Sequence, residues 1–264
     1  MRLAKQIFFV SIILLGIIGL GFTFWLRDRY VVPILTYHHI GEPSEKHLIL
    51  NTVSAESFEK QMRFLEKNGY VVISTKDLVH GIKKGRLFRR NTVVIQFDDG
   101  YEDNYTYAFP ILKKYDFPAM VFLISDYVGK PGFLTWEQVK EMEDNDVKAG
   151  AHTRNHAYLP DLPEDQIREE IAGSKRVIEE HLGHPVDYLA YPTGGFNVPA
   201  KRIAKEAGFK AAMTTNRGKD KFNEDLYELK RIRVKNSDMD FGGVPLWAKL
   251  SGYYNLFRKT KEGE

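Results

Sequence analysis

Two adjacent carboxylates, Asp98 and Asp99, are the first candidates for chemistry. They directly follow residues 92–97, a β-branched and aromatic run typical of a buried strand, and Gly100 comes next. On a continuing strand the two side chains would point to opposite faces. If the strand ends here and Gly100 adopts a conformation that a β-carbon disfavours, both acids can face one pocket. Asp-Gly is also a common solvent-exposed turn, so the pair needs support from elsewhere.

The second candidate group is the pair His152 and His156, which follows a short predicted strand at residues 147–151. In a helix, or in a loop after a strand, this spacing allows two imidazoles to bind one metal ion. A carboxylate from Asp98 or Asp99 would complete a set of two histidines and one acid, and the other carboxylate could act as a base. Such a centre keeps a position open for water and suits hydrolysis of an amide or ester.

Hydrolysis also needs donors for the oxyanion and an acid for the leaving group. Gly194 and Gly195, with Thr193 and its neighbours, follow another predicted strand, and we expect open backbone N–H groups there. His38 and His39 follow the first predicted strand, and either could supply the acid.

Strands and helices alternate along most of the chain, and the candidate residues fall just after strands. The pattern indicates a parallel α/β fold, either a barrel or a doubly wound sheet, with its site at the carboxyl ends of the strands. The predicted strands are 34–37, 70–73, 92–97, 119–124, 147–151, 187–191, 209–214 and 229–234. The predicted helices include 101–114, with a kink or late start at Pro110, as well as 163–182 and 199–207.

Composition excludes several classes of site. The chain has 264 residues, and its net charge of +3 comes from 38 basic and 35 acidic residues without a basic stripe, so nucleic acid is not an expected partner. Because there is no cysteine, a disulfide framework, a thiolate metal site and a cysteine nucleophile are all excluded. Any metal must therefore be held by His, Asp or Glu.

An uncharged apolar stretch at residues 7–26 follows Arg2 and Lys5. About 20 such residues can span a bilayer, whereas a cleaved signal peptide usually has a shorter apolar region and a small-residue cleavage site. We therefore expect residues 1–26 to be an uncleaved transmembrane anchor and 27–33 a short stalk. The basic end would stay inside, which makes this a single-pass cell-membrane protein with an extracytoplasmic catalytic domain.

Three motifs resemble those of a known family. FDDG at 97–100, HTRNH at 152–156 and YPTG at 191–194 are similar to the polysaccharide deacetylases with the nodulation-B homology domain, carbohydrate esterase family 4. The resemblance implies a distorted (β/α) barrel with fewer than eight full repeats at 34–235, followed by a tail at 236–264. It also implies removal of N-acetyl groups from an amino-sugar polymer and a divalent metal, usually zinc. Cobalt, nickel or manganese would also suit such ligands.

The resemblance also implies a role for each site residue. Asp98 would be the general base. The implied metal ligands are Asp99, His152 and His156. The oxyanion would be stabilised by the backbone of Tyr191, Pro192 and Thr193.

Two features of the family are missing. Ala190 replaces an arginine that orients the base, and Thr193 replaces an aromatic residue. The leucine-x-histidine motif of the usual acid is absent, because no histidine follows His184. With LTYHHI at 35–40, these gaps are similar to the poly-N-acetylglucosamine deacetylases of biofilm systems, in which the histidine corresponding to His38 is implied to be the acid.

The expected function is therefore metal-dependent deacetylation of an N-acetylglucosamine-containing polysaccharide, such as poly-N-acetylglucosamine or a peptidoglycan-like glycan. A glycosidase using Asp98 and Asp99 is disfavoured, because its carboxylates would sit ~5–9.5 Å apart across the sugar. It would also leave the histidine pair without a role. A non-catalytic polysaccharide-binding or scaffold protein is the alternative; Ala190 favours it, and the retained acids and histidines argue against it.

Overall fold

The computed structural model describes residues 6, 9, 11–21, 30–42, 51–216, 220, 222–239 and 244–257. The chain divides into two compact units, Met1–Val31 and Val32–Glu264. Residues 11–21 are helical. Within the described ranges, no helix has both the length and the apolar character needed to cross a membrane. Much of the anchor predicted at residues 1–26 lies outside these ranges.

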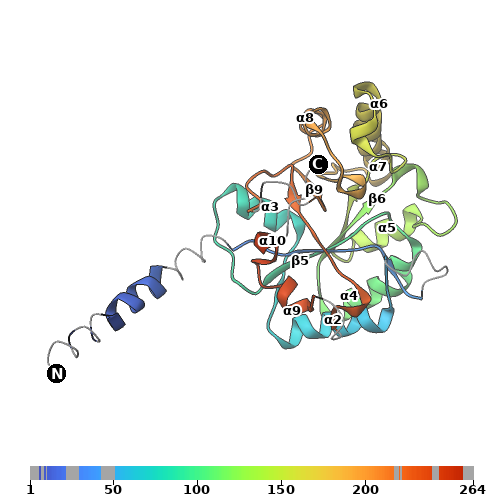
Figure 1. The fold of residues 1–264 in the computed structure, drawn as a ribbon. Coiled ribbons are helices and arrows are strands. Elements are labelled where there is room, and N and C mark those ends of the chain that lie inside the picture. The colour runs from blue at the N-terminus through green and yellow to red at the C-terminus, as the bar shows by residue number, and fades with distance from the viewer. Residues whose placement is uncertain are drawn as a thin grey trace. The chain divides into compact units, whose positions relative to one another are not determined.

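The second unit is an α/β fold built on a nearly closed parallel barrel (Figure 1). Among the described residues, nine strands pair in the order β10-β9-β8-β7-β6-β5-β1-β11, with β4 beside β5. Their bounds are β1 Ile34–Tyr37, β4 Val71–Val72, β5 Thr92–Phe97, β6 Ala119–Leu123, β7 Val147–Ala151, β8 Tyr188–Ala190, β9 Ala211–Thr214, β10 Leu229–Lys230 and β11 Ile232–Arg233. A separate parallel pair joins β2 His39–Ile40 to β3 Thr52–Val53. The barrel expected from the motifs is thus confirmed.

One short segment nearly closes the barrel. We predicted a single strand at 229–234, but this segment changes partner at Arg231: β10 pairs with β9, and β11 pairs with β1. The Arg231 N–H donates to the Thr214 carbonyl at 2.9 Å, and the Val234 N–H to the Thr36 carbonyl at 3.1 Å. The single-strand prediction was wrong because the segment crosses from one edge of the sheet to the other. It pairs with β9 at the first edge and must change to β1 at the second.

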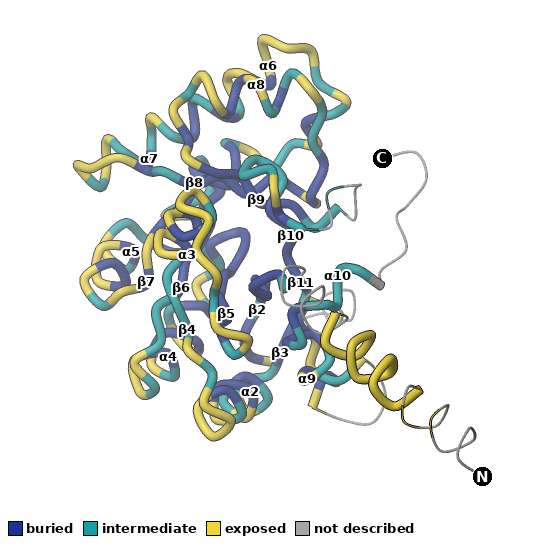
Figure 2. The backbone as a smooth tube through the Cα atoms, turned by 90° about the vertical axis from the view of Figure 1, so that its left-hand side faces the viewer, coloured by how far each residue is buried: buried dark blue, intermediate teal, exposed yellow. Residues whose placement is uncertain are grey.

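Helices cover the outside of the barrel, and their outward sides are exposed (Figure 2). In α2, Phe58, Met62 and Leu65 are buried at helical spacing, and the Ser54 hydroxyl accepts from the Ser57 N–H at the N-terminus. The principal helices are α2 Ala55–Lys67, α3 Thr75–Lys83, α4 Phe109–Tyr115, α5 Trp136–Glu143, α6 Glu164–Arg168, α7 Ser174–Leu182 and α8 Val198–Glu206, with the short α9 Leu246–Lys249 and α10 Tyr254–Phe257 near the C-terminus.

Two predicted helices are interrupted by π-helical turns. Asn104–Ala108 is π-helical, and α4 begins at Phe109, directly before Pro110, which matches the predicted late start. The helix predicted at 163–182 is broken between α6 and α7 by a second π-helical turn at Glu169–Gly173, which hydrophobic spacing did not indicate.

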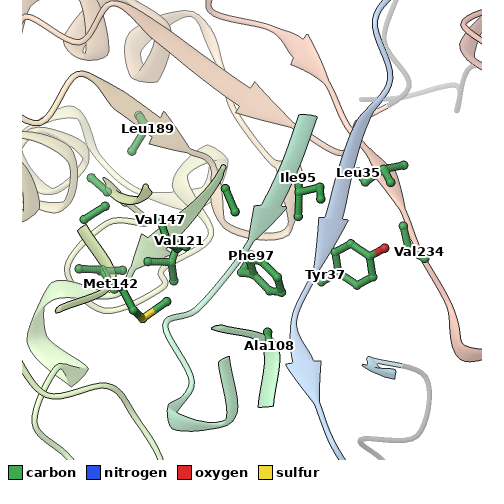
Figure 3. Packing of buried hydrophobic residues seen from close by; sticks show 14 of the residues in the cluster. Leu35, Tyr37, Ile95, Phe97, Ala108, Val121, Met142, Val147, Leu189 and Val234 are labelled. Carbon is green, nitrogen blue, oxygen red and sulfur yellow. The ribbon is translucent and has the colours of Figure 1, made fainter. Parts of the chain in front are cut away.

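Alternate strand residues serve two environments. Leu35, Ile95 and Val121 belong to the hydrophobic core that the helices cover (Figure 3). The residues between them point into the barrel, where the Arg231 guanidinium contacts Asp98 and lies 5.5 Å from the centroid of the Phe122 ring. The barrel interior therefore leads directly to the polar residues at its carboxyl end.

Candidate active site and metal centre

The turn after β5 brings both acids to one cavity. The Asp98 N–H still donates to the Tyr37 carbonyl at 3.0 Å, but Asp99 and Gly100 then adopt φ values of 72° and 74°. Asp98 and Asp99 consequently line the same cavity, of about 860 Å³. The conformation predicted for Gly100 is confirmed. The left-handed Asp99 was not predicted, although aspartate tolerates this region better than most residues.

The two histidines reach the cavity from the loop after β7. The His152 N–H donates to the Leu123 carbonyl at 2.8 Å, and Thr153 and His156 take φ values of 62° and 60°. The His156 N–H donates to the Thr153 hydroxyl at 3.2 Å. A loop rather than a helix therefore creates the spacing, and strand register places it beside Asp99.

Asp99, His152 and His156 form a cluster with the chemistry of a metal site. Their ligand atoms lie within 4.8 Å of one another, and each Nε2 is 3.4 Å from Asp99 Oδ1. The buried Oδ1 has no hydrogen-bond partner within the described part of the chain. His152 Nδ1 lies 2.7 Å from the Ala190 carbonyl, an interaction that directs its Nε2 toward the cluster. A buried carboxylate oxygen between two imidazole nitrogens fits a divalent cation.

The electrostatics agree with cation binding. Burial opposes ionisation of Asp99, yet His152, His38 and His156 lower the pKa of Asp99 below its ordinary value. Burial lowers the pKa of His156, which favours the neutral imidazole that metal binding requires. Burial opposes protonation of His152, but Asp98 and Asp99 raise its pKa, which shows that this position favours positive charge.

Arg231 holds the other acid. Its two terminal nitrogens lie 2.5 and 2.7 Å from the two oxygens of Asp98, and the two side chains are only 1% and 4% exposed. Burial raises the pKa of Asp98, but Arg231, with His152 and His38, lowers it on balance. Arg231 thus supplies a guanidinium to the acid although Ala190 occupies the usual arginine position. Sequence reasoning missed it; the available signal was a cluster of cations within the buried segment LKRIRV at 229–234.

The structure separates the two candidate acids. His38 lines the cavity, with its Nε2 3.9 Å from Asp98 Oδ2. Burial lowers the pKa of His38, although Asp98 and Asp99 oppose this effect. His39 instead lies with its Nδ1 2.6 Å from Asp103 Oδ2. His38 is therefore the member of the pair that meets the cavity acids.

One of the candidate oxyanion donors keeps a backbone N–H group that is not already hydrogen-bonded within the described residues. Gly194 and Gly195 N–H groups donate to the Tyr191 and Pro192 carbonyls, so the expectation that both would be open was wrong. The Tyr191 N–H donates to the Met213 carbonyl, and proline has no N–H. Thr193 lines the cavity with φ 55°, and its N–H meets no acceptor among the residues described. The turn thus uses the N–H groups of Gly194 and Gly195 in its own hydrogen bonds, and the Thr193 N–H remains available to a substrate.

The segment after residue 236 also reaches the cavity. Val244, Lys249 and Tyr254 line it, and the Lys249 ammonium lies 2.5 Å from Asp238 in a buried ion pair. The sequence analysis had assigned these residues only to a tail at 236–264. The cavity thus combines a candidate base, acid, oxyanion donor and metal centre, which together suit hydrolysis of an amide.

Comparison with known proteins gives the family. A family model described as polysaccharide deacetylase matches residues 86–212. YxkH of Bacillus subtilis, which carries a provisional polysaccharide deacetylase name, is 32% identical over 203 residues, covering 77% of this chain and 71% of YxkH. The poly-β-1,6-N-acetyl-D-glucosamine N-deacetylase of Staphylococcus aureus is 28% identical over 207 residues, covering 73% of this chain and 71% of that protein.

A solved structure agrees. The Streptococcus pyogenes deacetylase PplD, in complex with acetate, superposes with a TM-score of 0.72 and 31% identity over 78% of this chain and 92% of PplD. The motifs at the strand ends, the nearly closed barrel and these relatives lead to the same assignment. The chain belongs to the polysaccharide deacetylase family of hydrolases.

Proposed function

We propose that this enzyme is a metal-dependent N-deacetylase of an N-acetylglucosamine-containing polysaccharide. The observation that carries the proposal is the buried Asp99 oxygen between His152 and His156, next to an Asp98 carboxylate that Arg231 holds. A glycosidase would leave this arrangement of histidines without a role. A scaffold protein would not need the candidate base, acid and ligands in one cavity.

Each residue has a defined task in this proposal. Asp99, His152 and His156 would hold the metal, with Zn²⁺ the expected ion. When bound, such a cation polarises a carbonyl oxygen and lowers the pKa of water. Asp98 takes the proton of the attacking water, and its ion pair with Arg231 keeps it ionised and oriented.

The remaining residues act on the amide itself. The Thr193 N–H donates to the oxygen that becomes negative as water attacks the carbonyl carbon. His38 gives a proton to the departing sugar nitrogen, and the lowered pKa of His38 makes its imidazolium a stronger acid. The C–N bond breaks, and the products are acetate and a sugar with a free amine.

The substrate class is supported by the staphylococcal relative, whose name gives poly-β-1,6-N-acetyl-D-glucosamine as its substrate. A peptidoglycan-like glycan carries the same N-acetyl group and is the second polymer to test. We further propose that the catalytic domain acts outside the cytoplasm, anchored by the apolar residues 7–26. Support for this location comes from the sequence alone.

Acetate release tests the activity. Purified protein is incubated with N-acetylglucosamine oligomers, poly-N-acetylglucosamine and peptidoglycan glycan strands, with and without added Zn²⁺. We expect metal-dependent acetate from the poly-N-acetylglucosamine substrates. Folded, metal-loaded protein that releases no acetate from any of them would overturn the proposal in favour of a binding protein.

A further inference from the structure

One wall of the cavity is aromatic and has no task in the mechanism above. Tyr101, Tyr127 and Phe133 line it, and all three are partly exposed. They come from the loops after β5 and β6, beside the turn that carries Asp98 and Asp99. None of the three is among the buried residues of the hydrophobic core or the partly buried residues that pack against it.

Backbone hydrogen bonds join the two loops that carry these rings. The Glu102 N–H donates to the Gly132 carbonyl at 3.0 Å, and the Leu134 N–H donates to the Gly100 carbonyl at 2.9 Å. Tyr101 and Phe133 face each other between these two bonds as an isolated antiparallel bridge. The wall is therefore part of the same backbone turn that positions the acids.

Ring packing fixes the wall further. The Phe133 ring lies 5.3 Å from Tyr101 and 5.1 Å from Tyr127, centroid to centroid, and meets Tyr127 edge to face at 72°. Behind Tyr101, the His39 ring stacks at 3.5 Å and is held by Asp103. Such a wall loses little conformational entropy when a ligand binds to it.

We propose that Tyr101, Tyr127 and Phe133 form a subsite for a sugar ring next to the N-acetylated unit that is hydrolysed. A pyranose presents C–H groups on one face, and these carry slight positive charge that suits the negative face of an aromatic ring. The wall shares its cavity with the catalytic groups, so the ring that stacks there belongs to the same polymer. This inference rests on the proposed polysaccharide N-deacetylase function.

The subsite makes hydrolysis depend on chain length. Polymer and hexasaccharide reach the wall, whereas a small acetyl ester such as p-nitrophenyl acetate uses only the catalytic groups. Phe133→Ala and Tyr127→Ala should therefore lower the ratio of kcat/KM for an N-acetylglucosamine hexasaccharide to kcat/KM for the ester. We expect about a tenfold fall for the double variant, mostly through KM.

The conservative variants Phe133→Tyr and Tyr127→Phe should keep the ratio. Tyr107→Ala is the matched control, because Tyr107 is 47% exposed and is not among the described residues that line the cavity. An equal fall with both substrates, or no fall with either, would overturn the subsite.

Binding separates this inference from the proposed function. Calorimetry with Asp98→Asn protein and the hexasaccharide should show about a tenfold weaker Kd when Tyr127→Ala and Phe133→Ala are added. If wild-type protein hydrolyses the ester but not the hexasaccharide, the proposed N-deacetylation fails, and this titration still decides the subsite. An unchanged Kd would overturn it.

Discussion

Replacing Arg231 by methionine tests how the candidate base is held. The guanidinium makes two hydrogen bonds to Asp98, of 2.5 and 2.7 Å, and both side chains are almost completely buried. Methionine is also long and unbranched, but it removes both donors together with the guanidinium that lies 5.5 Å from the centroid of the Phe122 ring. Asp98 would then be a buried carboxylate without its main counter-ion.

The magnitude follows from that burial. Removing one partner of a buried ion pair typically costs about 3–5 kcal/mol, because the remaining charge is left uncompensated. His38 and His152 also lower the pKa of Asp98 and compensate part of its charge, so we expect about 3 kcal/mol of unfolding free energy to be lost at pH 7. Turnover should fall ~10²–10⁴-fold as the base loses its orientation and its low pKa.

The loss of stability has a defined pH dependence. Because the folded-state pKa of Asp98 is below that of the unfolded chain, the ion pair stabilises fully above the unfolded value, about 4. Its contribution disappears as pH falls through the folded-state pKa. The difference in unfolding free energy between wild type and Arg231→Met should therefore be largest near neutral pH and shrink below about pH 4.

Denaturant unfolding at several pH values and acetate release measure these effects. Arg202→Met is the control, because Arg202 is 44% exposed and pairs with Glu164 and Glu206 on the surface, where solvent screens ion pairs and they contribute little to stability. A loss for Arg231→Met no larger than that of the control at pH 7, or an unchanged turnover, would refute the role of Arg231.

Three further pairs of substitutions test the other parts of the site. Asp99→Ala should abolish stoichiometric metal binding, measured by metal analysis. Asp98→Asn should keep the metal but lose acetate release. A near-normal rate for Asp98→Asn would exclude Asp98 as the base. His38→Ala should lower kcat ~10²–10⁴-fold with unchanged metal content, and a larger effect of His39→Ala would reassign the acid. Gly194→Ala should lower Tm and activity, because Gly194 has φ +80° and a β-carbon would overlap the Thr215 hydroxyl and lie 2.7 Å from its backbone nitrogen. Gly208→Ala, with φ +83° and no atom within 4 Å, reports the backbone strain alone and should lower Tm less.

Much of the site follows from strand order. Because parallel strands end at one edge, a sequence that places Asp99 after one strand and His152 after another already predicts their meeting. The structure also separates His38 from His39, which the sequence left open, because His38 Nε2 lies 3.9 Å from Asp98 and His39 contacts Asp103. The sequence pattern alone cannot decide which of two neighbouring histidines faces the site, since each side chain could turn toward a different partner.

Arg231 could not be predicted in the same way. Its partner is 133 positions earlier, and the pairing depends on a chain that changes strand partner at a single residue. The open N–H of Thr193 depends equally on a local turn that uses the N–H groups of Gly194 and Gly195. Such features depend on three-dimensional closure and on individual φ values, which hydrophobic periodicity does not encode.

Metal titration of the purified protein tests the central claim most directly. Metal-free protein receives increasing Zn²⁺ while acetate release from poly-N-acetylglucosamine is measured, with Asp99→Ala protein in parallel. We expect no acetate without metal, a rise that saturates at about one equivalent, and no rise for Asp99→Ala. Metal-independent acetate release by wild-type protein, or full activation of Asp99→Ala at one equivalent, would contradict the assignment of Asp99, His152 and His156 as the catalytic metal centre.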